Sequence, residues 1–580
     1  MLTATSLVRD DPDSARRAIE SLLALAARAD ADSANVLLST AMHIAESFAE
    51  SWGDSVPGRT VAWFRAAGHD SRVGKAAADS LRRSGGTALR AEGLQPALRL
   101  WRASLDEARG VGDTVGLVAA TVNIGVAFYT AGELDSATAW LEPAYRRALA
   151  IADYRAAGTA LGTLASIRKD REEYRAAAEL YQRAAELQDR VGDTRGLAAA
   201  HNNLGLVAAA VGDTTRAREA YERALDLNRR FKRPAAAAAN LVNLGTLADL
   251  QGNYGRAVRL YREALDAYVA AGDSLSTGLA LQNLGRLELR RGNYRTAVAS
   301  LTRALAIHRR IGPAAAAHSV AIDLSRAHAA TGAVQAAARV LDRAEQLETS
   351  GGLAEGDRAS LALARAELEA RLNRVEAADR YLAAAERYFE AAGDPASQAD
   401  AREERALMDL RRGRHRAALG HLRQALRVRE LAGDVRASAG TRLLLGFAAG
   451  ELGDTAEARR AYDESRTTFA RVGDPAGEAE ALGALGQLAL LEGLPLSADS
   501  LYAAALDRLK RRPAPPLAWR LHLGRAEALR GSRATGAAAR ELQAAIAEIE
   551  RFAGAFALPE IRSAFMADKW TPYAELAQLE

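Results

Sequence analysis

One unit of about 40 residues repeats three times without interruption between positions 203 and 305, a period typical of repeat arrays. An Asn-Leu-Gly tripeptide begins at Asn203, Asn243 and Asn283, and each copy is followed by a Gly-Asp or Gly-Asn pair. Each copy then continues with a small-large-small pattern, Ala-x3-Tyr/Leu-x2-Ala-Leu. Self-similarity at a fixed step of this size indicates an array of stacked repeats, in which every unit buries its apolar face against its neighbours.

Each unit divides into two predicted helices of about 16 residues, here called helix A and helix B. Helix A carries the tripeptide, whose Gly allows a partner helix to approach closely. The Gly-Asp/Asn turn ends helix A and caps helix B, because Gly tolerates the left-handed conformation and Asp or Asn accepts from free backbone N–H groups. Helix B places Ala217, Tyr221 and Ala224 on one stripe. The expected fold is all-α: an α-solenoid of about eleven or twelve helix-turn-helix units with a helical N-terminal cap.

The repeat does not extend over the whole chain with equal regularity. The first residues do not fit it, as expected for an atypical terminal unit that covers the open apolar face of an array. Beyond residue 313 the tripeptide changes to Asp323-Leu324-Ser325, and Leu-Gly returns at Leu445. The predicted divisions are a cap at 1–74, a repeat array at 75–530 (regular at 110–310, degenerate at 313–420, regular again at 425–495) and a C-terminal helical connector at 531–580.

The Leu-Gly of helix A, the Gly-Asn-Tyr turn and the Ala-x3-Tyr-x2-Ala-Leu of helix B resemble the tetratricopeptide repeat family. The 40-residue step is similar to the longer units of Pins/LGN-type and kinesin-light-chain-type arrays. This resemblance implies a right-handed superhelix whose concave face is lined by the A helices. It also implies a protein–protein interaction role.

The end of the chain carries a second resemblance. Leu558-Pro559, then Glu560-x-Arg562, Phe565 and Tyr573 resemble the helical connector that precedes the protease domain of bacterial CHAT proteins, which are caspase- and separase-like. The resemblance implies a bacterial protein that works with a CHAT protease domain, in cis in a longer gene product or in trans.

Chemistry-bearing motifs are absent from the sequence. It contains no Cys, which excludes thiolate metal sites, a Cys nucleophile and disulfides within these residues. The nine His are scattered and form no His-Glu-x-x-His pair, and no Gly-x-Ser-x-Gly elbow occurs. We therefore expect a non-catalytic chain with no cofactor and no metal.

Charge and hydropathy limit the other partners. The chain has 77 basic and 73 acidic residues, a net charge of +4, which argues against a nucleic-acid-binding surface. No uncharged apolar run reaches the roughly 18 residues of a membrane span. We expect a cytoplasmic protein without membrane or nucleic-acid partners.

The candidate binding residues lie on helix A. By the family resemblance, the residue before Leu-Gly faces the groove, and its Asn carries both donors and acceptors that can pair with a peptide backbone. An alternative remains open, in which Asn recurs because it joins adjacent repeats. The candidate peptide-binding residues are Asn123, Thr163, Asn203, Asn243, Asn283 and Asp323, with Asn202, Gln282 and Arg286 beside them.

Three functions fit these observations. The first is a scaffold that binds a protein or extended peptide segment in its groove, as the recognition or regulatory region of a CHAT-type protease system. The second is a stand-alone adaptor built from the same repeats. The third is the helical sensor arm of a signal-transduction regulator.

Overall fold

A computed structural model describes residues 4–251, 253–291, 293–348, 354–372, 374–431, 434–511, 515–554 and 569–579. These residues form helices and turns only. The chain divides into two compact units, an N-terminal unit at Met1–Asp273 and a C-terminal unit at Ser274–Glu580, and each is described by itself.

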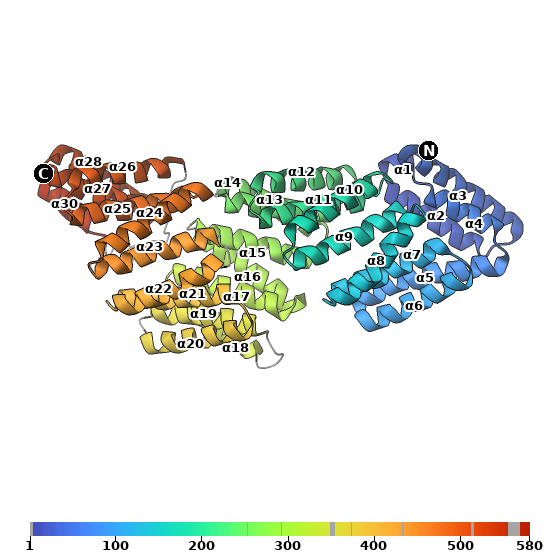
Figure 1. The fold of residues 1–580 in the computed structure, drawn as a ribbon, viewed down its shortest axis with the longest axis horizontal. Coiled ribbons are helices and arrows are strands. Elements are labelled where there is room, and N and C mark those ends of the chain that lie inside the picture. The colour runs from blue at the N-terminus through green and yellow to red at the C-terminus, as the bar shows by residue number, and fades with distance from the viewer. Residues whose placement is uncertain are drawn as a thin grey trace. The chain divides into compact units, whose positions relative to one another are not determined.

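The N-terminal unit begins with a bundle of four helices, called the cap below, and continues with antiparallel helix pairs (Figure 1). The cap helices are α1 (Ala4–Asp10), α2 (Pro12–Ala26), α3 (Ala31–Trp52) and α4 (Val56–Ala66). The pairs, with helix A before helix B, are α5 (His69–Ala91) and α6 (Leu94–Gly110), α7 (Thr114–Thr130) and α8 (Leu134–Ala150), α9 (Tyr154–Asp170) and α10 (Tyr174–Asp189), α11 (Thr194–Ala210) and α12 (Thr214–Arg230), and α13 (Pro234–Leu250) and α14 (Tyr254–Ala270).

The C-terminal unit continues the same alternation and closes with a short helix that packs on the last pair (Figure 1). Its pairs are α15 (Ser274–Arg290) and α16 (Tyr294–Ile311), α17 (Ala314–Ala330) and α18 (Val334–Glu348), α19 (Glu355–Arg371) and α20 (Val375–Ala391), α21 (Pro395–Arg411) and α22 (His415–Leu431), α23 (Val435–Glu451) and α24 (Thr455–Val472), α25 (Pro475–Leu491) and α26 (Pro495–Arg511), and α27 (Pro515–Gly531) and α28 (Thr535–Gly554), followed by α30 (Thr571–Leu579).

The predicted fold class is confirmed, because the described residues contain twelve helix pairs and no strand. Most helices are 17 residues long and are joined by three-residue turns. At a typical turn Gly212 adopts φ +80°, and Asp213 accepts a hydrogen bond from the backbone N–H of Arg216 at 3.0 Å. The residue before the helix thus caps it, as the Gly-Asp pattern predicts.

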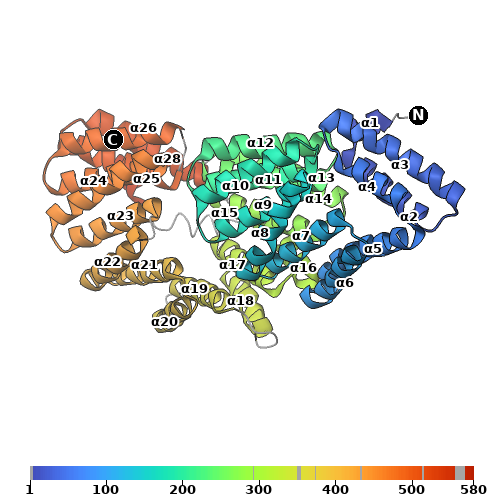
Figure 2. The ribbon, with the colours of Figure 1, turned by 45° about the vertical axis from the view of Figure 1, so that its right-hand side comes forward.

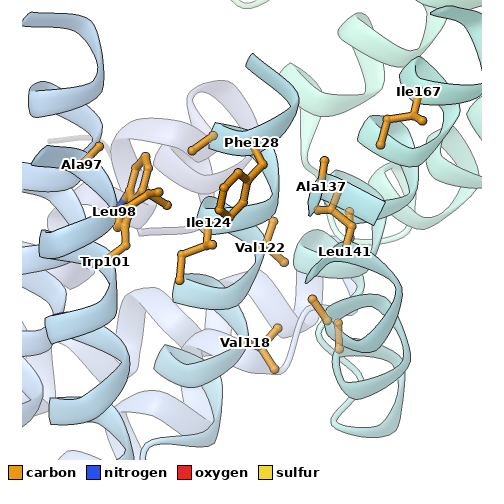
Figure 3. Packing of buried hydrophobic residues seen from close by; sticks show 14 of the residues in the cluster. Ala97, Leu98, Trp101, Val118, Val122, Ile124, Phe128, Ala137, Leu141 and Ile167 are labelled. Atoms are coloured by element: carbon orange, nitrogen blue, oxygen red, sulfur yellow. The ribbon is translucent and has the colours of Figure 1, made fainter. Parts of the chain in front are cut away.

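Around α6–α9 the buried core crosses the junctions between successive pairs (Figure 3). One cluster joins Trp101 of α6, Ile124 of α7, Leu141 of α8 and Ile167 of α9, all nearly inaccessible to solvent. Each helix pair completes the burial of its apolar side chains only against its neighbouring pairs. The free energy of unfolding is therefore shared between adjacent pairs, as in other repeat arrays.

A buried histidine of the C-terminal unit, His308, predicts that the stability of this unit depends on pH. Burial lowers the pKa of His308, whose ring on α16 packs against Gly278 of α15. Unfolded His takes up a proton near pH 6.5, whereas His308 in the folded unit resists protonation. The unfolded state therefore binds more protons, and the stability of the C-terminal unit is expected to fall as the pH drops from about 7 to 5. The measurement is the urea concentration at the midpoint of unfolding, determined at each pH.

The variant His308→Phe should flatten this acid slope, because the replacement cannot take up a proton in either state. The exposed His69 provides the control, and His69→Phe should leave the slope unchanged. A His308→Phe slope as steep as that of the wild type would contradict the assignment.

Candidate peptide-binding face

The A helices form the inner layer of each unit. In the N-terminal unit α5, α7, α9 and α11 contact one another in sequence, in addition to contacting their own B helices. In the C-terminal unit the same holds for α15, α17, α19 and α21, and for α23, α25 and α27. The face of this layer that points away from the B helices is called the A-helix face.

The Gly of the tripeptide does not line the A-helix face. A Cβ atom on Gly205 would lie 2.5 Å from the Tyr221 ring, and one on Gly245 would lie 2.7 Å from the Tyr261 ring. Each Gly therefore receives the large side chain of its own helix B, as the close approach of the two helices predicts. Burial raises the pKa of Tyr221 to about 12, so the phenol stays neutral in this contact.

The Asn residues of the N-terminal unit form a hydrogen-bonded network across two adjacent A helices. Asn202 of α11 is its centre, because its Oδ1 accepts from Nδ2 of Asn240 at 2.9 Å and from Nδ2 of Asn243 at 2.8 Å. The Nδ2 of Asn202 in turn donates to Oδ1 of Asn203 at 3.4 Å. Asn228 on helix B of the preceding pair donates to Oδ1 of Asn240 at 2.9 Å.

The predicted residues of the C-terminal unit make a similar link between α15 and α17. Gln282 Nε2 donates to Ser319 Oγ at 3.0 Å and to Asp323 Oδ2 at 2.9 Å. Arg286 Nε lies 3.8 Å from the same carboxylate oxygen. Asp323 is only 8% exposed, so these donors compensate the charge of a nearly buried carboxylate. Asn283 is half-buried beside Gln282.

The two remaining predicted residues lie outside these links. Thr163 of α9 is half-buried, and its Oγ1 donates to the carbonyl of Thr159 in its own helix at 3.0 Å. Asn123 of α7 lines a cavity of about 440 Å³ between the cap and the A helices. The nine predicted residues therefore do not form one set: the structure joins Asn202, Asn203 and Asn243 in one group, and Gln282, Arg286 and Asp323 in another.

Of the two alternatives that the sequence leaves open, this geometry shows contacts of the packing kind. Asn202 and Asn243 join adjacent repeats, which is the packing role. An Asn amide, however, offers two donors and two acceptor lone pairs, and the network uses one N–H of Asn243 and one lone pair of Asn203. Both side chains are half-buried. The network therefore fixes the orientation of amides that keep hydrogen-bonding capacity for another group.

Sequence reasoning did not single out Asn228 or Asn240, both of which are nearly buried. A signal existed: the two Asn are 12 residues apart across a B–A turn, a spacing that brings the last turn of helix B to the first half of the next helix A.

Charged residues near the cavity were also missed. Lys75 of α5 is only 3% exposed, and its Nζ donates to Asp113 Oδ2 at 2.5 Å. Burial raises the pKa of Asp153 at the start of α9, and the nearby negative charge of Asp54 raises it further. The cavity between the cap and the A helices thus has charged residues in its lining.

Comparison with known proteins identifies the repeats. Residues 156–230 and 235–310, which span α9–α12 and α13–α16, match a family model described as tetratricopeptide repeat. These two stretches are tetratricopeptide repeats. The tetratricopeptide repeats contain most of the predicted binding residues, whereas Asn123 and Asp323 lie outside the matched stretches.

Several solved structures match the chain at low similarity. They include the apo form of RapI (12% identity, covering 68% of this chain and 98% of that chain, TM-score 0.45) and the Rap protein complexed with Competence and Sporulation Factor (13%, 62% and 99%, 0.44). A third is BtubC from P. vanneervenii (22%, 37% and 91%, 0.35). These identities and TM-scores carry no inference about function. No curated protein matches the chain significantly.

Two other kinds of site do not occur within the described ranges. No group of three or more His, Cys, Asp or Glu side chains there is arranged to hold a metal ion. None of the helices described is long and apolar enough to cross a bilayer.

Proposed function

We propose that this chain is a non-catalytic scaffold that binds a protein or extended peptide segment on the A-helix face of its N-terminal repeats. The observation that carries the proposal is the network in which Asn202 orients the amides of Asn203 and Asn243. A ligand backbone presents alternating N–H and C=O groups, and an oriented amide can pair with both. Preorganised amides lose little conformational entropy when the ligand binds.

The experiment begins with a partner captured from a bacterial lysate by the full chain and identified by mass spectrometry. The interacting segment is then made as a peptide, and its affinity is measured for the double variant Asn203→Ala/Asn243→Ala. We expect a loss of about tenfold or more, because each hydrogen bond contributes about 0.5 to 1.5 kcal/mol.

The control is Asn35→Ala, which removes an exposed Asn from cap helix α3 and should leave the affinity unchanged. Thermal unfolding of the double variant decides between binding and packing. A variant that unfolds far below the wild type would show that the amides act mainly in packing, and an unchanged affinity in a folded variant would refute the binding site.

The identity of the captured partner decides a finer proposal, that the scaffold is the recognition or regulatory region of a cytoplasmic bacterial CHAT-type protease system. This proposal is supported by the sequence of residues 541–580. Its Leu-Pro, Glu-x-Arg and Phe positions fall at 558–565, outside the described residues. Tyr573 lies on α30, and its hydroxyl donates to Glu550 Oε1 of α28 at 3.3 Å. A CHAT protease domain among the partners supports it, and partners of other classes support a stand-alone adaptor.

A further inference from the structure

The cap contacts the repeats at several turns that are far apart in the sequence. On α2, Arg16 Nη2 donates to the carbonyl of Val191 at 2.7 Å, and Asp13 Oδ2 accepts from Arg233 Nη2 at 2.8 Å. Arg195 Nε lies 3.5 Å from the same Asp13 oxygen. These partners belong to the turns that precede α11 and α13 and to the start of α11.

A second set of contacts comes from α3 and α4. Arg59 of α4 donates through Nη2 to the carbonyl of Ile151 at 2.6 Å. Trp52 of α3 lies directly over Gly192, where an added Cβ would meet its ring at 2.4 Å. The cap therefore lies along the N-terminal ends of α9, α11 and α13, and both views show the cap helices next to this part of the unit (Figures 1 and 2).

The contact is polar at its edges and hollow in its centre. Ile19 and Leu23 of α2 are buried mainly within the cap's own core. Between α2 and α4 on one side and the A helices on the other remains the cavity of about 440 Å³, whose floor includes the small side chains of Ala119 and Ala156. Intramolecular interfaces that are polar and incompletely packed separate more readily than apolar cores.

The Asp13–Arg233 ion pair that holds the cap is shielded from solvent. Asp13 is 12% exposed and Arg233 13%, while Arg16 at 11% also pairs with Asp54 inside the cap at 2.7 Å. Removing one member of such a pair leaves the other charge shielded and unpaired. Besides the contact of Trp52 with Gly192, the cap is thus held to these turns by a few polar bonds, which single substitutions can remove one at a time.

From these contacts we propose that the cap is a lid over the N-terminal part of the A-helix face, held closed by Asp13, Arg16 and Arg59, and that it opens to admit the ligand. The inference rests on the proposed function, since it regulates access to the same face. In the closed state the lid covers the floor around Ala119 and Asn123. The affinity for a ligand is then reduced in proportion to the fraction of molecules with the lid open.

Access to the floor is tested by cysteine alkylation in the full chain, which has no native Cys. Ala119 on the floor is half-buried, so Ala119→Cys places a thiol under the lid, and N-ethylmaleimide is the probe. The lid variant is Asp13→Asn/Arg59→Ala, which leaves the Arg16–Asp54 pair of the cap intact. We expect alkylation at position 119 to become about tenfold faster or more in the lid variant, because the rate follows the open population.

Two controls accompany the measurement. Arg17 on the same helix is exposed and donates to Ser14 within α2, so Arg17→Ala should leave the rate unchanged. Ala239→Cys places a thiol at the equivalent, exposed position of α13, outside the cavity lining, and should react equally in all variants. An equal rate at position 119 in wild type and lid variant would overturn the proposal.

Distance measurements separate opening from unfolding. Spin labels on Val36→Cys of α3 and Arg183→Cys of α10, both exposed, should give one narrow distance distribution in the wild type and an added longer population in the lid variant. Hydrogen exchange in α1–α4 should remain protected. Loss of that protection would show that the contacts stabilise the cap's fold and would overturn the lid. None of these readouts requires a partner, so their failure is distinct from failure of the proposed function.

Discussion

Replacing Arg429 by alanine is expected to destabilise α21–α23 by about 2 to 3 kcal/mol, because it removes the charge-assisted hydrogen bonds of a nearly buried guanidinium. Arg429 on α22 donates through Nη2 to Asp400 at 2.5 Å, and its Nη1 contacts Glu403 and Thr441. Thr441 on α23 also donates to Glu403 Oε2 at 2.8 Å. One guanidinium therefore joins three helices of two adjacent pairs. Burial acts to lower the pKa of Arg429, but Glu403 and Asp400 outweigh it and raise the pKa.

The effect should be local, because repeats are coupled mainly to their neighbours. Hydrogen exchange resolved by peptide measures it, with faster exchange in α21–α23 and little change in α25–α28. The matched control is Arg423→Ala on the same helix, whose pair with Glu457 is exposed on the Arg side and contributes less than about 1 kcal/mol. Equal effects of the two substitutions would contradict the network's role.

The variant Gly245→Val is expected to destabilise α13 and α14 by about 1 to 3 kcal/mol through overpacking. An added Cβ meets the Tyr261 ring at 2.7 Å, and Tyr261 is only 2% exposed. Valine is the informative replacement, since Ala165 already packs next to Tyr181 in the α9–α10 pair. A single methyl group is thus tolerated at this position in one helix pair, whereas the branched side chain of valine forces α13 away from α14.

The control lies at the start of the partner helix. Gly255 is exposed there on α14, and a Cβ would meet only the end of Arg259 at 4.0 Å. Gly255→Val should change the stability by no more than about 0.5 kcal/mol. Thermal unfolding and hydrogen exchange of both variants give the comparison, and a Gly245→Val protein as stable as the control would refute close packing as the reason for this Gly.

The sequence predicts the fold well because its signals are local. Gly212 and Asp213 define the end of one helix and the cap of the next within two residues, and Ala217 with Tyr221 defines the buried stripe within four. Each signal recurs at a fixed step, so an irregular unit can be placed from its neighbours. The match of 156–230 and 235–310 to the tetratricopeptide repeat model covers the part where these signals are strongest.

The candidate site was predictable only in part. Asn203 and Asn243 could be placed on helix A from the tripeptide, but the direction of an amide depends on partners in the next repeat. Nothing in the spacing shows that one oxygen of Asn202 accepts from both Asn240 and Asn243. The cap contacts are even harder to predict from the sequence, because Asp13 and Arg233 are 220 positions apart and neither belongs to a recognisable motif.

The regular turn spacing has a consequence for how this chain can change in length. Helices of 17 residues alternate with turns of constant length in the regular repeats. If one whole helix pair is gained or lost, the next pair therefore still follows a turn of the same length. Tandem duplication is therefore compatible with the chain beyond α13. It is not compatible with the stretch from Ile151 to Arg233, where α2, α3 and α4 contact three successive turns between pairs. The cap thereby fixes the number of repeats along which it lies. Repeats can be added only after α13.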